Sequence, residues 1–139
     1  MTRPPPTSGL FALPSTPVTP LTAIVWWELR RIPYNLIIGA FGIVSLFVFL
    51  FSISATGILE PGEDAIEPMA LFAAPFVANI CYTAGWLVDA PLRLIFPAIS
   101  PRFTPLLFQL GLYFSLVVIS YPAVYWSGYR VLQVLNVLR

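Results

Sequence analysis

The chain contains no histidine and no lysine, and its single cysteine is Cys81. Without histidine it lacks the commonest metal ligand and the usual proton-transfer group near neutral pH. A lone cysteine forms no disulfide within the chain, and the apolar stretch around Cys81 predicts a buried, unreactive thiol. The sequence also has no glycine-rich phosphate loop, no zinc-ligand spacing and no serine paired with a general base. We therefore expect no enzymatic activity.

Charge is scarce as well. Only 9% of the 139 residues are charged, whereas 58% are apolar and the mean hydropathy is +0.86. Soluble domains carry about a quarter charged residues and need them to stay in solution. The net charge of +1 creates no field that attracts nucleic acid. This composition predicts a single membrane domain whose main partner is the lipid bilayer.

The N-terminal segment is rich in proline, which removes backbone donors and keeps the chain extended. We expect a disordered tail over residues 1–19. Thr19 and Pro20 then form a helix start, with Thr19 as the N-cap and Pro20 in the first turn. The following residues 20–32 predict an amphipathic helix at the membrane interface, which Pro33 separates from the next element.

Long stretches without charge predict an all-α membrane protein. About 20 apolar residues are needed to cross the hydrocarbon core, and the chain has three such stretches. The predicted spans are residues 35–57, 69–89 and 104–128, and an amphipathic C-terminal extension follows at residues 129–139. Asp89 and Pro91 mark the end of the second span or a sharp kink, and Pro122 predicts a kink in the third.

The basic residues indicate the orientation, because arginine and lysine concentrate in cytoplasmic loops. The N-terminal side of the first span and the connection before the third span carry arginines, whereas the loop at residues 60–68 carries only acids. We expect a multi-pass protein of the bacterial inner, or cytoplasmic, membrane. Its N-terminus would be cytoplasmic and its C-terminus would lie across the membrane.

The second span has three different faces when its residues are placed at 100° intervals. One face is bulky and apolar, as lipid tails tolerate. A second face consists of small residues that let another helix approach closely. These small residues are Ala70, Ala74, Ala78 and Gly85. The third face is polar and consists of Asn79, Tyr82, Thr83, Trp86 and Asp89. We expect this helix to be the buried one.

The polar face has two interpretations. Unsatisfied polar groups are costly in lipid, so Asn79 and Thr83 are predicted to hydrogen-bond between helices and fix their register. The alternative is a ligand or ion site lined by the same residues. Asp89 lies near the membrane boundary, where an ion pair with Arg93 or Arg102 would satisfy it.

A second polar and aromatic cluster precedes the first span. It consists of Trp26, Trp27, Glu28, Arg30, Arg31, Tyr34 and Asn35. Indole rings and guanidinium groups suit the headgroup region, so the cluster is interpreted as an interfacial anchor. The alternative is a specific site for a lipid headgroup or a partner. Glu28 and Arg31 have the spacing of an ion pair along one helix face.

These two clusters carry a resemblance. The pattern Trp27-Glu28-x-x-Arg31 before Tyr34-Asn35, together with Asn79-x-x-Tyr82-Thr83-x-Gly85-Trp86, resembles a group of small uncharacterised bacterial membrane proteins. The similar region covers roughly residues 26–90. The resemblance implies a membrane protein and implies no mechanism.

The leading functional hypothesis is therefore an accessory or scaffolding subunit that packs against a larger membrane complex. A small oligomeric transporter or channel component is the alternative. It requires self-association, because three spans are too few to enclose a pathway. No cofactor is predicted, and binding of a lipid, quinone or pigment between the helices remains a third hypothesis.

Overall fold

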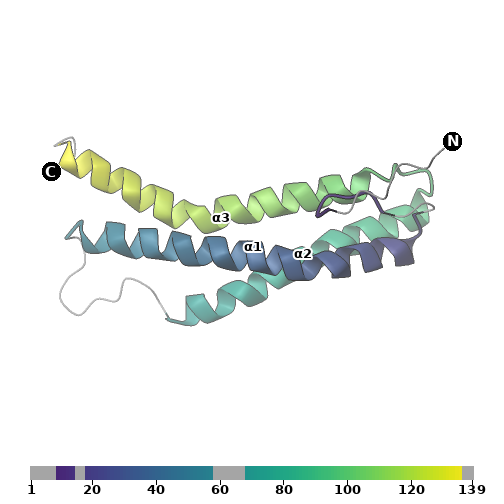
Figure 1. The fold of residues 1–139 in the computed structure, drawn as a ribbon, viewed down its shortest axis with the longest axis horizontal. Coiled ribbons are helices and arrows are strands. Elements are labelled where there is room, and N and C mark those ends of the chain that lie inside the picture. The colour runs from purple at the N-terminus through teal and green to yellow at the C-terminus, as the bar shows by residue number, and fades with distance from the viewer. Residues whose placement is uncertain (1–8, 15–17, 58–67, 136–139) are drawn as a thin grey trace. The chain divides into compact units, whose positions relative to one another are not determined.

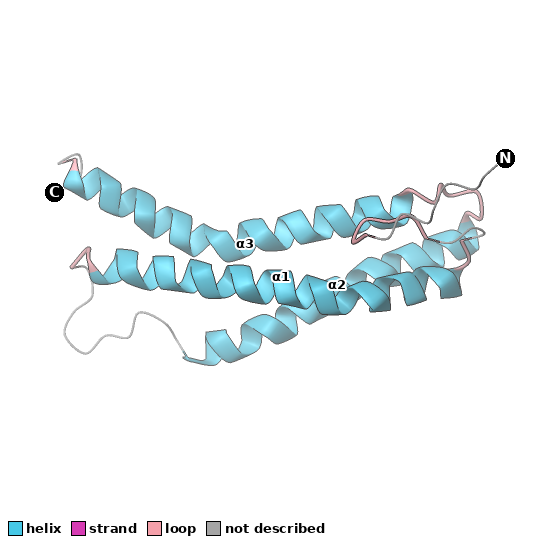
Figure 2. Ribbon diagram, viewed as in Figure 1, coloured by secondary structure: helices cyan, strands magenta, loops and turns pink. Residues whose placement is uncertain are grey.

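Three helices account for most of the chain in the computed structural model, which describes residues 9–14, 18–57 and 68–135. They are α1 (Pro20–Ser54), α2 (Pro68–Ile95) and α3 (Phe103–Val134), in chain order (Figure 1). Within the described ranges there is no strand (Figure 2). The expected all-α class is confirmed. The acidic loop lies outside the described residues, and the side chains of residues 68–72 do as well.

The predicted start of the first helix is confirmed. α1 begins at Pro20, and the backbone N–H of Thr22 donates to the Thr19 hydroxyl at 3.2 Å. In return, the backbone N–H of Thr19 donates to the Thr22 hydroxyl at 2.8 Å. This reciprocal arrangement is a capping box in which threonine takes the place of the usual Glu or Gln.

The predicted break at Pro33 is wrong, because α1 continues through this residue to Ser54. The expected interfacial helix and the expected first span are thus one helix of 35 residues. Proline removes one backbone hydrogen bond from a helix, but tertiary contacts hold both sides here. Trp27 before Pro33 and Tyr34 after it are both buried in the same aromatic cluster.

The other two helices are also longer than predicted. α2 passes Asp89 and Pro91 and ends at Ile95, so the expected end of the second span at these residues is wrong. α3 continues through Pro122 to Val134. It thereby includes the first part of the expected C-terminal extension, whose last residues lie outside the described ranges.

The chain divides into two compact units. Unit 1 comprises Met1–Asn35 and Ala78–Phe114, and unit 2 comprises Leu36–Val77 and Ser115–Arg139. In unit 2, α1 and α3 contact through small polar side chains. Ser45 donates to the carbonyl of Ile119 at 2.8 Å, and the hydroxyls of Ser52 and Ser127 lie 3.0 Å apart.

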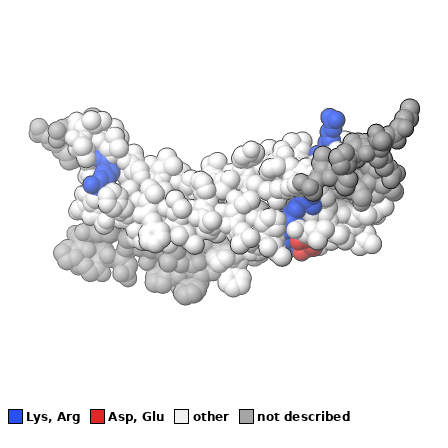
Figure 3. All heavy atoms as spheres, viewed as in Figure 1, with Lys and Arg blue, Asp and Glu red and all other residues white. Residues whose placement is uncertain are grey.

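Two of the three helices, α1 and α3, are long and apolar enough to cross a membrane. The third expected span, on α2, is not among the helices that qualify within the described residues. Large apolar side chains are exposed along all three helices, among them Phe47, Phe76 and Val117. On the face drawn in Figure 3, charged groups are few and most of the described surface is uncharged.

Candidate functional site

Unit 1 brings the two clusters predicted from the sequence together. The N-terminal half of α1 supplies the aromatic and arginine cluster, and the C-terminal half of α2 supplies the polar face. The two helices run antiparallel here, because Trp27 contacts Asp89 whereas Asn35 contacts Asn79. The first turns of α3 complete the site through Thr104 and Phe108.

Asp89 is the central acceptor of this site and is fully buried, with 0% exposure. It forms an ion pair with Arg93, one helical turn later, at 2.9 Å. The Trp27 indole donates to it from α1 at 3.1 Å, and the Thr104 hydroxyl donates to it from α3 at 2.6 Å. One carboxylate therefore connects all three helices. A buried charge needs such a complete set of partners to offset its loss of hydration.

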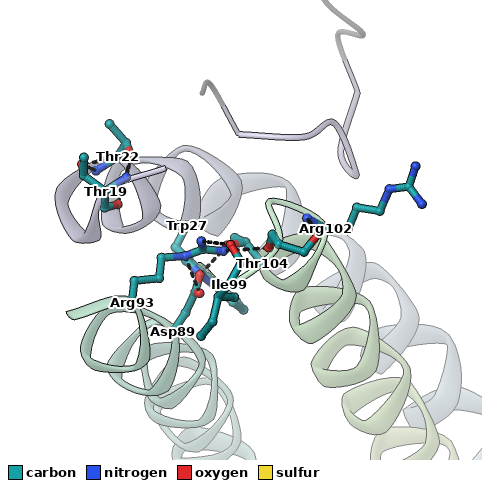
Figure 4. Close-up of polar contacts among 9 residues, drawn as sticks. Thr19, Thr22, Trp27, Asp89, Arg93, Ile99, Arg102 and Thr104 are labelled. Atoms are coloured by element: carbon teal, nitrogen blue, oxygen red, sulfur yellow. Dashed lines mark hydrogen bonds and ion pairs between the residues drawn. The ribbon is translucent and has the colours of Figure 1, made fainter. Parts of the chain in front are cut away.

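The guanidinium of Arg93 closes the network. It donates to the Thr104 hydroxyl at 2.8 Å and to the carbonyls of Ile99 and Ser100 at 3.4 and 3.5 Å (Figure 4). The predicted ion pair of Asp89 is thus confirmed with Arg93. Arg102, the other expected partner, is exposed and points away from the network (Figure 4).

Aromatic rings fill the space between the helices of unit 1. Trp27 is 2% exposed and makes edge contacts with Trp26, Tyr82 and Phe108 at centroid distances of 5.4–5.8 Å. The ring centroids of Tyr34 and Tyr82 are 4.6 Å apart, and the Tyr82 hydroxyl donates to the carbonyl of Trp27. Such pairs stabilise by about 0.5–1.5 kcal/mol beyond the area they bury.

The prediction that Trp26, Trp27 and Tyr34 anchor the chain in the lipid headgroups is therefore wrong. All three are buried inside unit 1. The apolar residues on the opposite side of α1, Leu21 and Leu29, are exposed instead. The helix buries its aromatic face because the rings gain contacts with α2 and α3 that lipid headgroups do not offer.

Gly85 lets α2 approach the Trp27 ring of α1 closely. A Cβ atom built on this glycine would lie 2.6 Å from an atom of the Trp27 ring. Real Cβ atoms do not come that close, so only glycine fits against the indole. Gly85 thus confirms its predicted role in close packing. Of the other small residues, Ala78 is half-buried, Ala74 is exposed and the side chain of Ala70 lies outside the described residues.

A second polar group surrounds Arg31 at the edge of the unit. Its guanidinium forms a bidentate ion pair with Glu28 at 2.7 and 2.8 Å, which confirms the predicted pair. It also donates to Asn79 at 3.4 Å and to Thr83 at 3.2 Å. Asn35 and Asn79 exchange amide hydrogen bonds at 3.0 and 3.1 Å.

Arg30 binds the segment that precedes α1. Its guanidinium lies 3.8 Å above the Trp26 ring and donates to the carbonyls of Leu10 and Gly9 at 2.6 and 3.2 Å. The Trp26 indole donates to the carbonyl of Ala12 at 2.8 Å. The prediction of a disordered tail is wrong for residues 9–14, which these donors hold against α1. Residues 1–8 and 15–17 of the tail lie outside the described ranges.

Two further residues from the sequence analysis, Trp86 and Cys81, differ from what their patterns predict. Trp86 belongs to the polar stripe, but its buried indole N–H makes no hydrogen bond with the described residues. Cys81 is exposed, so the expected burial of its thiol is wrong. Its position on α2 is 100° from that of Tyr82 and 200° from that of Thr83, so it lies outside the polar face that contacts α1.

Sequence reasoning did not identify three parts of the site, namely Thr104, Phe108 and the segment at residues 9–14 that binds α1. Thr104 is fully buried and Phe108 is 1% exposed, four residues further along α3. A hydroxyl and an aromatic ring at this spacing share one helix face, which is the signal that could have indicated them. Phe108 contacts five aromatic rings: Phe11, Trp26, Trp27, Tyr34 and Tyr82.

Comparison of the chain with protein-family models, with curated proteins and with solved structures found no match. The functional inference therefore rests on the geometry of the site. The buried donors of Trp27 and Arg93 both bind Asp89, and Arg31 binds Glu28, Asn79 and Thr83. Chemically, this arrangement holds three helices in a fixed register.

Proposed function

We propose that this chain is a multi-pass protein of the bacterial cytoplasmic membrane and acts there as a non-catalytic accessory subunit of a larger membrane assembly. All three helices would lie in the bilayer, with α2 shielded partly by a partner. The partner would be a transmembrane helix of another membrane protein. The polar groups of unit 1 would serve the internal architecture and leave the apolar helix surfaces for assembly.

The observation that carries this proposal is the exposure of α2 at residues 73–77. These five consecutive residues cover more than one full helical turn of 3.6 residues, so α2 is exposed on all sides there. Ala74 is small and exposed, whereas Phe76, 200° further around the helix, is bulky and 71% exposed. Small residues allow the backbone of another helix to approach closely in a membrane. An exposed surface that combines small residues with a bulky one suits a partner helix better than lipid alone.

The proposal is tested by extracting the full chain from its native membranes in mild detergent and measuring the size of the complex. We expect a stoichiometric complex with a second membrane protein. Ala74→Phe should dissociate it, because the larger side chain prevents close approach of a partner helix. Ala40→Phe, at an exposed position on α1, should leave the complex intact.

Circular dichroism and tryptophan emission of both variants would establish that the fold is retained. A wild-type protein that is monomeric in detergent, and that forms no cross-links in native membranes, would contradict the proposal. A complex that contains only copies of this chain would contradict the accessory role and favour the oligomeric transporter or channel instead.

A further inference from the structure

The Glu28–Arg31 ion pair differs from the Asp89–Arg93 pair in being open to the surroundings. The side chains of Glu28 and Arg31 are 45% and 29% exposed, whereas those of Asp89 and Arg93 are 0% and 2% exposed. The buried pair has a structural role that accounts for it. The exposed pair can contact a ligand from outside the protein.

Arg31 is held in place from its inner side. The Thr83 hydroxyl and the Asn79 amide of α2 accept from it, and its guanidinium lies 5.0 Å from the centroid of the Tyr82 ring. A guanidinium has five N–H donors. Bonds to Glu28, Asn79 and Thr83 use four of them within the described residues. One donor on Nη1 remains for a ligand.

Glu28 complements this donor. Each of its carboxylate oxygens accepts one hydrogen bond from Arg31, and each retains acceptor capacity because a carboxylate oxygen has two lone pairs. The pair therefore presents a positive donor beside negative acceptors and carries no net charge. A ligand that matches it has an anionic and a cationic group within a few ångströms of each other.

The surroundings of the pair indicate a lipid. Ile32 on α1 and Ile80 on α2 neighbour the polar group and are 71% and 69% exposed. In the sequence, Arg31 is the last charged residue before the span predicted at residues 35–57. At 1.5 Å per residue, it lies about 6 Å outside that span. This is the depth of the headgroup layer next to the hydrocarbon core.

We propose that Glu28 and Arg31 bind the headgroup of phosphatidylethanolamine. The phosphate accepts from Arg31 Nη1, and the ammonium group donates to the Glu28 carboxylate. Phosphatidylcholine has the same charges, but its quaternary ammonium has no N–H to donate. Phosphatidylglycerol has no cation for Glu28 and would place its phosphate beside that carboxylate. This inference rests on the membrane location in the proposed function.

The test uses the full chain in nanodiscs that contain phosphatidylethanolamine, phosphatidylcholine and phosphatidylglycerol in equal amounts. Mass spectrometry of the lipids that stay bound in detergent measures the selection. We expect phosphatidylethanolamine to be enriched over phosphatidylcholine about tenfold, the factor that one hydrogen bond to a charged group supplies. Glu28→Gln should abolish this preference and increase bound phosphatidylglycerol, because Arg31 then lacks its anionic partner.

Arg102→Gln is the matched control. Arg102 is exposed and points away from the buried network (Figure 4), so its loss should leave the ratio of phosphatidylethanolamine to phosphatidylcholine unchanged. Soluble phosphoethanolamine should not displace the lipid, because it lacks acyl chains to contact Ile32 and Ile80. Displacement by this compound would contradict a lipid site.

Equal retention of the three lipids by the wild-type chain would overturn the inference, and so would a preference for phosphatidylglycerol. Both outcomes leave the proposed function standing, since the chain would still lie in the bilayer. A chain that does not enter nanodiscs at all would overturn the membrane location and this inference together. Circular dichroism of Glu28→Gln would show whether its fold, and hence the comparison, is intact.

Discussion

At the residue scale, Gly85 and Trp27 form a close contact between α1 and α2. The ring cannot move aside, because its indole nitrogen is bonded to Asp89 and its faces and edges contact Tyr82 and Phe108. The absence of a side chain at Gly85 thus makes room for the large indole ring of Trp27. Any added volume must displace a buried network and not a flexible chain end.

Replacing Gly85 should therefore destabilise the protein although alanine favours helices. Gly85→Ala places a methyl group 2.6 Å from the Trp27 ring, and overpacking of this kind costs about 1–3 kcal/mol. Thermal unfolding in detergent, followed by tryptophan emission, measures the loss. Gly39→Ala is the control, since no atom lies within 4 Å of its added Cβ. It should be neutral or stabilising by up to about 1 kcal/mol. Equal effects of the two substitutions would contradict the close contact.

At the scale of the elements, the Asp89 network explains how α2 is attached to its neighbours. Its partners come from α1 at Trp27 and from α3 at Thr104. The residues that it joins are up to 62 positions apart in the sequence. An isolated buried carboxylate would be strongly destabilising, whereas one with three donors holds its helices in a single register.

Breaking the network on one side should destabilise the fold more than removing both charges. Asp89→Asn leaves the Arg93 guanidinium buried without its anion, which costs about 3–5 kcal/mol. The double variant Asp89→Asn with Arg93→Met removes both charges and should lose less. Denaturant titration in detergent, followed by circular dichroism, compares them. The role of the pair would be refuted if Asp89→Asn were as stable as the wild type.

The segment at residues 9–14 shows a limit of local reasoning at the same scale. Proline content correctly indicates that this segment forms no helix or strand. It does not reveal that Arg30 and Trp26 offer donors to the segment's backbone carbonyls. These bonds join residues 14 to 21 positions apart, so they depend on where α1 presents its side chains and not on the composition of the tail.

At the scale of the whole molecule, the number of membrane spans decides the topology. α1 and α3 qualify by length and apolarity, and the proposed function adds α2 as a span shielded by a partner. Three spans place the two chain ends on opposite sides of the membrane. If only α1 and α3 crossed, both ends would be on one side. The distribution of arginine predicts that the N-terminus is cytoplasmic.

Reporter fusions in bacterial cells distinguish these topologies. A green fluorescent protein at the N-terminus should fluoresce, because it matures in the cytoplasm. A phosphatase that folds only outside the cytoplasm should be active when it is fused to the C-terminus. The reverse pair of fusions should be inactive. Fluorescence from a C-terminal fusion would contradict the third span and would leave α2 outside the set of membrane-crossing helices.

The sequence by itself determined the features that depend on neighbouring residues. The helical class, the start at Thr19 and Pro20, the Glu28–Arg31 pair and the polar stripe of α2 all follow from local spacing, because residues three or four apart share a helix face. For Asp89, the sequence indicated two possible ion-pair partners, Arg93 and Arg102. Arg93 is four residues after Asp89, so the same spacing selects it because α2 continues past Pro91. Only tertiary structure brought Thr104 of α3 to this pair.

Tertiary structure also decided which face of α1 is buried and whether that helix survives Pro33. Composition places tryptophan and arginine equally well in lipid headgroups and in a protein core. Contacts with Tyr82 and Phe108, which are distant in the sequence, put Trp27 in the core. The same contacts support the helix on both sides of the proline. Helix formation is local and was therefore predictable, whereas the choice of partner depends on long-range packing.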